Sequence, residues 1–379
     1  MPSPIYLDYN ATTPHDPEVI AAMRPFLEHE FGNPSSSHWY GIAPKRAVQT
    51  ARKQVASLIG CRPQELIFTS GGTESNNQAL KGVALAYQEK GRHIITSQIE
   101  HPAIFEVCRL LEQSGFVVTY LPVDNSGAVS VSDVKAAIRA DTILISIMHS
   151  NNEVGTIQPV EEIARLAKSR GIFIHTDAAQ SVGKVPIDVN SLGIDLLSIA
   201  GHKLYAPKGV GALYVRQGIE PAKLIHGAGQ ELGRRPGTEN VLEIVGLGKA
   251  CEVAQRDLER NMAWMKKMRD RLHAGLTKEQ QDVKLNGHPE RRLPNTLNVS
   301  FRGLEANRIL EEIGLEVAAS AGAACHSDGV DVSHVLTAMN VPIEWAKGTL
   351  RFSTGKMTTD QKVGSSNLSG RTRKPSDSA

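Results

Sequence analysis

Short apolar runs alternate with stretches of helical periodicity through the first part of the chain. The runs at residues 117–121 and 143–148 predict strands, and the apolar spacing at residues 131–139 and 160–169 predicts helices. Further strands are expected at residues 65–70, 92–97, 172–177 and 194–199. Such alternation is typical of a largely parallel sheet whose faces are covered by helices. We therefore expect an α/β fold.

Composition and charge narrow the class of protein. The chain has 379 residues, of which 41% are hydrophobic and 22% charged, so it is long enough for a large core and more than one domain. Its net charge of +2 gives no case for a nucleic-acid partner. No apolar stretch approaches the length of a membrane span, and no charged-then-apolar leader is present. We therefore expect a soluble, cytoplasmic protein without a membrane partner.

The four cysteines are widely separated, at Cys61, Cys108, Cys251 and Cys325. None has the C-x-x-C spacing of a zinc or redox site, so neither a metal centre nor a disulfide framework is predicted.

One lysine stands out. Lys203 follows Gly-His after the strand predicted at residues 194–199 and precedes a turn rich in proline and glycine. A lysine amine attacks carbonyl groups when its surroundings lower its pKa, and the commonest use of such a lysine is a Schiff base with pyridoxal phosphate. Taken alone, Lys203 fits a solvated surface charge better, so the interpretation depends on other residues.

A glycine pair follows the strand predicted at residues 65–70. Gly71 and Gly72 let the backbone approach an anion, the N–H groups of the following helix point at it, and Thr73 adds a hydroxyl. The segment matches neither the Walker loop nor G-x-G-x-x-G. It predicts a phosphate cradle, with an ordinary capped helix start as the alternative.

Two other strands end in polar residues, where ligands of parallel sheets bind. Residues 143–148 run into a polar segment that contains Asn152, and residues 172–177 end at Asp177, with Gln180 close behind. An acid at the end of an apolar strand needs a partner, and a protonated pyridine nitrogen is one candidate. Asp177 as a helix cap is the alternative.

Together these motifs resemble the cysteine desulfurases of the NifS/IscS type, pyridoxal-phosphate enzymes of the class V aminotransferase group. The resemblance extends from about Ile5 to Thr359. It rests on Leu-Asp-Tyr-Asn-Ala-Thr-Thr, Gly-Gly-Thr-Glu-Ser-Asn-Asn, Asn-Asn-Glu-Val-Gly, His-Thr-Asp-Ala-Ala-Gln, Gly-His-Lys and Arg-Pro-Gly-Thr-Glu-Asn. It implies a type I fold of pyridoxal-phosphate-dependent transferases, with a mostly parallel seven-stranded sheet in a large domain and a smaller α+β domain.

The resemblance also implies a role for each matching residue. Lys203 would bond to the cofactor, Asp177 would pair with its pyridine nitrogen, and His101 would stack on its ring and assist proton transfer. The resemblance implies that Gln180 and Asn152 donate to the ring hydroxyl and to the substrate. It implies phosphate contacts for Gly72, Thr73 and His202. The substrate carboxylate would be held by Asn33 and Arg351. Thr238 would reach the phosphate of a neighbouring subunit, which implies a homodimer.

Cys325 lies in a segment of small residues, 319–329, which predicts a mobile loop, with a buried structural cysteine as the alternative. By resemblance, Cys325 would take the sulfur of L-cysteine as a persulfide, leave alanine, and pass the sulfur to an acceptor such as an iron–sulfur scaffold. Selenocysteine lyase is the close alternative. A plain aminotransferase is disfavoured because it has no use for Cys325.

We expect residues 15–256 to form the large domain, and residues 1–14 with 257–359 to form the small one. A charged helix near residues 256–276 would connect them, and residues 360–379 have too few apolar side chains to pack, which predicts a disordered tail. Relatives usually have a serine where this chain has Ala200, so one phosphate hydrogen bond would be missing. Because of Ala200 and the tail, the alternative stays open that the chain is not an active enzyme but a persulfide carrier or a binding partner.

Overall fold

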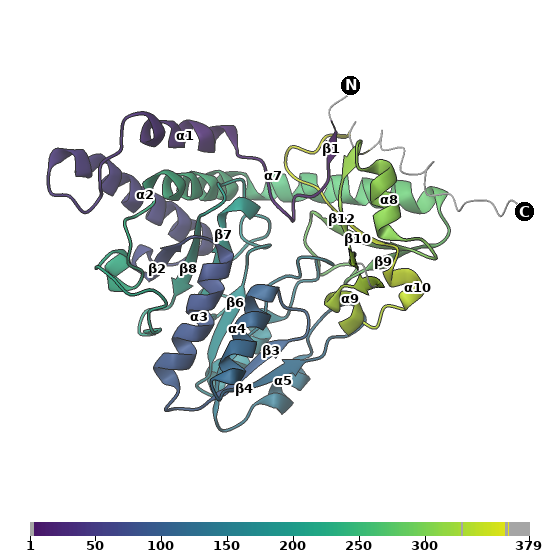
Figure 1. The fold of residues 1–379 in the computed structure, drawn as a ribbon, viewed down its shortest axis with the longest axis horizontal. Coiled ribbons are helices and arrows are strands. Elements are labelled where there is room, and N and C mark those ends of the chain that lie inside the picture. Colours follow the sequence, from purple (N-terminus) through teal and green to yellow (C-terminus); the bar gives the residue numbers. More distant parts are fainter. Residues whose placement is uncertain (1–3, 327–328, 361–362, 364–379) are drawn as a thin grey trace, which may run out of the picture.

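The computed structural model describes residues 4–326, 329–360 and 363 (Figure 1). The tail expected at residues 360–379 therefore lies outside the described residues, apart from Asp360 and Val363. Within the described part of the chain, no helix combines the length and apolar composition that crossing a membrane requires.

A seven-stranded sheet forms the centre of the larger part of the molecule. Its order is β2-β8-β7-β6-β5-β3-β4. The strands are β2 (Leu66–Thr69), β3 (His93–Ser97), β4 (Val117–Leu121), β5 (Thr142–Ser146), β6 (Phe173–Asp177), β7 (Leu196–Ala200) and β8 (Gly211–Val215). Only β8 runs antiparallel to its neighbours β2 and β7. The prediction of a mostly parallel seven-stranded sheet is confirmed.

Helices cover both faces of this sheet, and each face has its own apolar cluster. The helices α3 (Gly72–Tyr87) and α4 (Pro102–Gln113) pack on one face. The cluster on the other face includes residues of α1 (Pro17–Glu28), α2 (Ile42–Ile59), α5 (Val131–Ala137), α6 (Val160–Ser169) and the start of α7 (Val241–Glu279).

Helix α7 is 39 residues long and extends well before the predicted range of 256–276. Its early glycines interrupt the apolar pattern, but they serve close packing: a Cβ on Gly248 would lie 2.5 Å from the Ala51 Cα of α2. The Asn240 side chain caps the helix by accepting a hydrogen bond from the Glu243 N–H. The long helix runs beside both parts of the molecule (Figure 1).

The smaller part contains an antiparallel sheet of order β12-β15-β10-β9. Its strands are β9 (Val283–Asn286), β10 (Thr296–Phe301), β12 (Ser320–Ala321) and β15 (Thr349–Ser353), with α8 (Ala306–Ile313), α9 (His334–Ala338) and α10 (Ile343–Ala346) nearby. The N-terminal β1 (Ile5–Tyr6) pairs with β11 (Val317–Ala318), and Leu7 joins the apolar cluster of this part. Val335, Leu336, Met339 and Ala346, however, pack in the apolar cluster of the larger part. The proposed domains, whose boundary at residue 256 falls within α7, stay a proposal.

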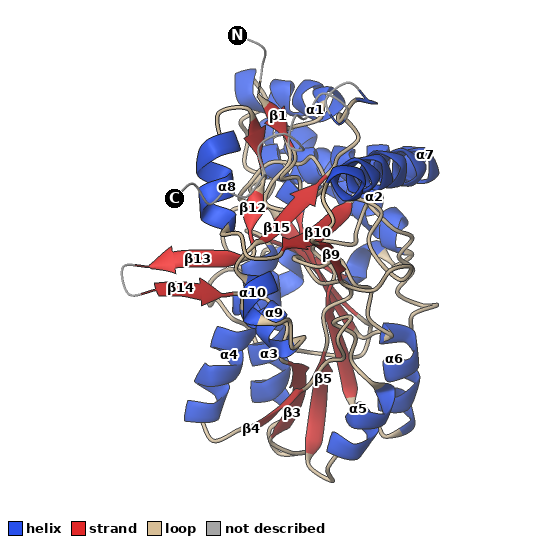
Figure 2. Cartoon of the chain, turned by 90° about the vertical axis from the view of Figure 1, so that its right-hand side faces the viewer, coloured by secondary structure: helices blue, strands red, loops and turns tan. Residues whose placement is uncertain are grey.

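The backbone around Cys325 forms a β-hairpin, which Figure 2 shows extending away from the rest of the chain. Strand β13 (Ala323–His326) pairs with β14 (Gly329–Val332), and Cys325 lies opposite Val330. A mobile loop was expected here, and the described backbone forms paired strands, because ladder hydrogen bonds use main-chain groups that small residues supply as well as large ones. The mobility of the segment stays a prediction. Residues 327–328 lie outside the described residues.

Candidate active site

A cavity of about 300 Å³ lies beside the carboxyl ends of β5, β6 and β7. In parallel sheets this is where ligands bind. Nine of the residues predicted from the sequence line the cavity: Gly72, Thr73, His101, Asn152, Asp177, Gln180, His202, Lys203 and Arg351. The fold therefore gathers side chains that are far apart in the sequence into one polar site.

Lys203 lies in the short 3-10 turn that follows β7. Its ammonium group donates hydrogen bonds to the backbone carbonyls of Asn10 and of Ala11, the latter at 2.8 Å. Burial, with a contribution from the positive charge of Arg351, lowers the pKa of Lys203 to about 8. About a tenth of this amine is therefore neutral and nucleophilic at pH 7, far more than for an unperturbed lysine.

Asp177 ends β6 and is held by two donors. The Asn76 amide donates to Oδ2 at 2.7 Å, and the Ala179 N–H donates to Oδ1 at 2.9 Å. Asn76 lies one turn into α3 from Gly72, and its buried Oδ1 has no hydrogen-bond partner in the described part of the chain. Asn76 was not predicted from the sequence. It lies four residues after Gly72, and this spacing places the two residues on one face of the helix.

The start of α3 has the form of a phosphate cradle. Gly71 has a φ of 149°, a conformation that disfavours side chains, and α3 begins at Gly72. A Cβ on Gly72 would approach the Ala200 Cβ to 3.3 Å, so Ala200 faces the cradle without offering a hydroxyl. Burial, followed by the charge of Lys203, lowers the pKa of His202 to about 4, which keeps its ring neutral.

His101 caps α4 through its own ring. Its Nδ1 accepts a hydrogen bond from the Ala103 N–H at 3.1 Å. Burial lowers the pKa of His101, so the ring is mainly neutral near pH 7. Because Nδ1 is an acceptor, the proton of the neutral ring resides on Nε2.

A hydrogen-bond network ties the N-terminal segment to the cavity. Gln180 Nε2 donates to the Asn10 carbonyl at 2.9 Å, and Gln180 Oε1 accepts from Lys184 Nζ at 2.8 Å. Asn10 also donates through Nδ2 to Thr296 Oγ1 at 2.8 Å. Burial lowers the pKa of Lys184. Asn10 and Lys184 were not predicted. Lys184 lies four residues after Gln180 in a segment of turns, and Asn10 belongs to the first motif.

Arg351 extends from β15 to the cavity. Its Nη2 donates to Asp8 Oδ1 at 2.9 Å and to Ser320 Oγ at 2.8 Å, and its Nη1 donates to the Asn152 carbonyl at 3.1 Å. Its buried Nε has no partner among the described residues. The contacts to Asp8, Ser320 and Asn152 therefore fix the orientation of the guanidinium beside the cavity.

Three predicted residues do not line the cavity. Asn33 is exposed, and its Oδ1 accepts a hydrogen bond from the Ser35 N–H at 2.9 Å. Thr238 is exposed in the segment that precedes α7. The backbone of Cys325 lies in β13, but its side chain lies outside the described part of the structure.

Comparisons with known proteins agree with this architecture. The family model "Aminotransferase class-V" matches residues 5–365. The chain is 52% identical to cysteine desulfurase IscS of Dictyoglomus turgidum over 360 residues, which are 95% of this chain and 91% of the relative.

Two solved structures superpose closely on the fold. One, described as a NifS-like protein, has a TM-score of 0.91 at 39% identity and covers 97% of each chain. Another, described as SspA in complex with cysteine, has a TM-score of 0.82 at 39% identity and covers 93% of this chain and 99% of its own. The chain therefore belongs to the class V aminotransferase family and, within it, to the cysteine desulfurases of the NifS/IscS type.

Proposed function

We propose that this chain converts L-cysteine to L-alanine, with pyridoxal phosphate as cofactor and Cys325 as the acceptor of the substrate's sulfur. One observation carries the proposal: Lys203, with its lowered pKa, lines the same cavity as the Asp177 carboxylate. An amine that is nucleophilic near neutral pH and a carboxylate at the end of a strand are the two groups this chemistry needs from the protein.

The residues of the cavity fit the four polar groups of pyridoxal phosphate, with Gln180 placed to meet the ring hydroxyl. The N–H groups at Gly72 and Thr73, with His202, would hold the phosphate; Asp177 would hold the ring nitrogen; and Lys203 would bond to the aldehyde. The unpartnered Oδ1 of Asn76 is a further buried acceptor in this cavity. When bound, the cofactor supplies a carbonyl for the substrate amine and a ring that withdraws electrons from the substrate's α-carbon.

Proton movement falls to Lys203 and His101. The neutral amine of Lys203 can remove the α-proton of the substrate, because its pKa of about 8 keeps both protonation states accessible. His101 carries its proton on Nε2, the nitrogen that its helix-capping bond leaves free. We assign to it stacking on the cofactor ring and a share in returning the proton.

Arg351 would bind the substrate carboxylate, assisted by Asn152, which lines the same cavity. The share expected for Asn33 stays a prediction, because Asn33 does not line this cavity. The guanidinium is already paired with Asp8, so the substrate has to share or replace this ion pair.

The sulfur transfer balances without an added oxidant. The Cys325 thiolate attacks the sulfur of the substrate, an S–S bond forms, and the Cβ–S bond of the substrate breaks. The electron pair stays with the carbon, which is protonated to give alanine, and Cys325 is left as a persulfide. The hairpin that carries Cys325 extends from the rest of the chain, which supports transfer of the sulfur to an external acceptor (Figure 2).

We further propose that the enzyme is a homodimer in which Thr238 of the partner subunit completes the phosphate site. A group of exposed aromatic side chains supports this: Phe31 is 79% exposed and Trp39 is 74% exposed, and both lie next to Tyr40. Apolar side chains so exposed are typical of a protein interface. The acceptor of the sulfur, by family resemblance an iron–sulfur scaffold, and a cytoplasmic location remain part of this proposal.

The test is release of alanine and sulfide from L-cysteine by the cofactor-loaded enzyme in the presence of a thiol reductant. We expect equal amounts of both products, lost in Cys325→Ala and in Lys203→Ala and kept in the control Cys61→Ala. Cys61 is a suitable control because burial raises the pKa of its thiol to about 12. Cofactor bound at Lys203 without either product would contradict the desulfurase function and favour a carrier, whereas greater activity on selenocysteine, retained in Cys325→Ala, would favour a lyase.

A further inference from the structure

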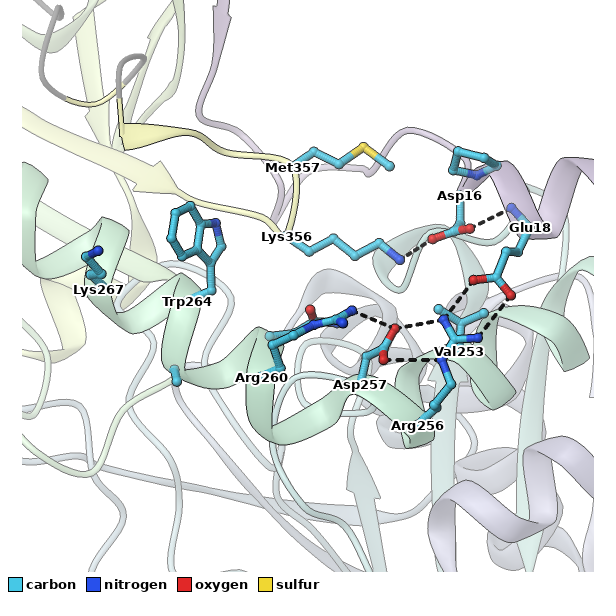
Figure 3. A pocket seen from close by; sticks show the side chains of 13 residues that line it. Asp16, Glu18, Val253, Arg256, Asp257, Arg260, Trp264, Lys267, Lys356 and Met357 are labelled. Atoms are coloured by element: carbon cyan, nitrogen blue, oxygen red, sulfur yellow. Dashed lines mark hydrogen bonds and ion pairs between the residues drawn. The ribbon is translucent and has the colours of Figure 1, made fainter.

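A second cavity, of about 760 Å³, lies apart from the active site and shares no residue with its lining. It is formed by the start of α1, one face of α7 and the segment Lys356–Met357 that follows β15 (Figure 3). A volume of this size suits a small organic molecule. The proposed function makes no use of this cavity.

The face of α7 that lines the cavity repeats at helical spacing. Asp257, Arg260, Asn261, Trp264 and Lys267 are three or four residues apart, so they form one stripe along the helix. The stripe thus combines an aromatic ring, an amide and charged groups on one rigid element.

Trp264 supplies an aromatic wall with a fixed orientation. Its indole Nε1 donates a hydrogen bond to the Thr358 carbonyl at 2.8 Å, which holds the edge of the ring. Met357 and Lys356 line the same cavity (Figure 3), and the ammonium group of Lys267 lies 5.4 Å from the centre of the indole ring. A ring held in this way can stack against a planar ligand with little loss of conformational freedom.

Asn261 gives the second indication of a ligand. The residue is only 9% exposed and lines the cavity, yet its side-chain amide has no hydrogen-bond partner among the described residues. The amide atoms are not fully shielded from solvent, so they face the cavity and are free to pair with the donor and acceptor groups of a ligand.

The charges of the lining favour an anion. Its three carboxylates are all paired: Asp16 with Lys356, Glu18 with Arg256, and Asp257 with both Arg256 and Arg260. Lys267 is the fourth basic side chain, and its only carboxylate partner in the described part of the chain is Asp360, outside the lining, at 3.8 Å. Lys267 and Arg260 are exposed and can turn toward a ligand.

We propose that this cavity binds a purine nucleoside monophosphate. The base stacks on Trp264, the amide of Asn261 pairs with the donor and acceptor groups on the edge of the base, and Lys267 with Arg260 holds the phosphate. Each of these groups lies on the stripe of α7, so the site needs no movement of the backbone.

The test is isothermal titration of the dimeric holoenzyme with adenosine 5′-monophosphate at low salt, after removal of unbound pyridoxal phosphate, which is itself an aromatic phosphate. We expect submillimolar binding that weakens about tenfold or more in Asn261→Leu, since an amide that loses its partner costs about this factor. Lys267→Gln should weaken binding severalfold and reduce its salt dependence. The neighbouring, exposed Lys266→Gln is the matched control and should bind like the parent chain.

Two smaller ligands, each lacking one part of the nucleotide, show how much the base and the phosphate contribute to binding. Adenosine should bind more weakly than the monophosphate, and inorganic phosphate should compete poorly. The proposal is overturned if no heat is seen with the monophosphate at 10 mM, if Asn261→Leu binds as well as the parent chain, or if phosphate alone competes as well as the nucleotide. Unchanged melting temperature and cofactor absorbance in the variants exclude misfolding as the cause of lost binding.

Discussion

The Asn76 side-chain amide donates a hydrogen bond to the Asp177 carboxylate at 2.7 Å. The bond joins the helix that forms the phosphate cradle to the strand that ends in the carboxylate. The two groups proposed to hold opposite ends of the cofactor are thus fixed relative to each other by one short contact.

Removal of this amide should impair the enzyme without unfolding it. A hydrogen bond to a charged group contributes about 1.5–3 kcal/mol, so we expect Asn76→Ala to lower kcat/KM by about ten- to a hundredfold. The visible absorbance of the bound cofactor should change too, because Asp177 would be less well oriented. The neighbouring Asn77→Ala is the control, since the Asn77 amide donates to the Thr73 carbonyl of its own helix and not to Asp177. Equal activity of both variants would show that Asn76 does not position Asp177.

The sequence predicted local elements better than it predicted contacts between distant segments. The strand at residues 117–121 and the helix at residues 160–169 have the predicted bounds, because apolar runs and helix-end charges act locally. Lys203 and Asp177 were found because each follows a strand. Asn10 was missed because its role depends on Gln180, a partner 170 residues away.

The helix predicted near residues 256–276 begins earlier in the structure, at Val241. The early part of α7 contains Gly246 and Gly248, which usually interrupt helices. Here they let α7 pack closely on its neighbours, and this tertiary contact outweighs the propensity. The pairing of β13 with β14 escaped prediction because small residues give no alternating apolar pattern.

The reactivity of Lys203 should follow its lowered pKa. With a pKa of about 8, the neutral amine increases about tenfold per pH unit below that value and levels off above it. We therefore expect the rate at which pyridoxal phosphate bonds to the cofactor-free protein to rise with pH and reach a plateau above pH 8. Stopped-flow absorbance would measure this rate.

Arg351→Gln should move that plateau to higher pH. Burial is the main cause of the lowered pKa of Lys203, and the charge of Arg351 is the next, so its loss allows the pKa to rise. Arg170→Gln, a change on the exposed surface, is the control and should leave the profile in place. An identical midpoint in Arg351→Gln would contradict the assigned electrostatic coupling.

The ion pair between Lys356 and Asp16 should stabilise the turn that follows Lys203. The Lys356 N–H donates to the Tyr205 hydroxyl at 2.8 Å, and the Tyr205 carbonyl accepts from the Asp16 N–H at 3.2 Å. Tyr205 has a φ of 68°, which is strained for a residue with a side chain. We expect Lys356→Met to lower stability by about 1–3 kcal/mol, because Asp16 loses its partner.

The loss of stability in Lys356→Met should become smaller in acid. Burial opposes ionisation of Asp16, but the hydrogen bond and charge of Lys356 prevail and hold the pKa of Asp16 below 3.8. A lowered acid pKa contributes stability above the unfolded value that is lost as pH falls through the folded value. The difference in Tm from the parent chain should therefore be constant from pH 7 to pH 5 and shrink only in stronger acid. Lys266→Met should have no effect, and a difference that shrinks near pH 6 would implicate another group.

Trp39→Glu should convert the proposed dimer to monomers. The side chain of Trp39 is 74% exposed and its ring lies 5.3 Å from that of Tyr40, so burial in an interface would stabilise a dimer that a carboxylate would disrupt. Light scattering after gel filtration would measure the mass. Because Thr238 of the partner subunit is proposed to contact the phosphate, the monomer should also bind pyridoxal phosphate more weakly. Leu315→Glu, at a site 91% exposed in the smaller part of the molecule, is the control and should remain dimeric. A Trp39→Glu protein that keeps the dimer mass would place the interface elsewhere.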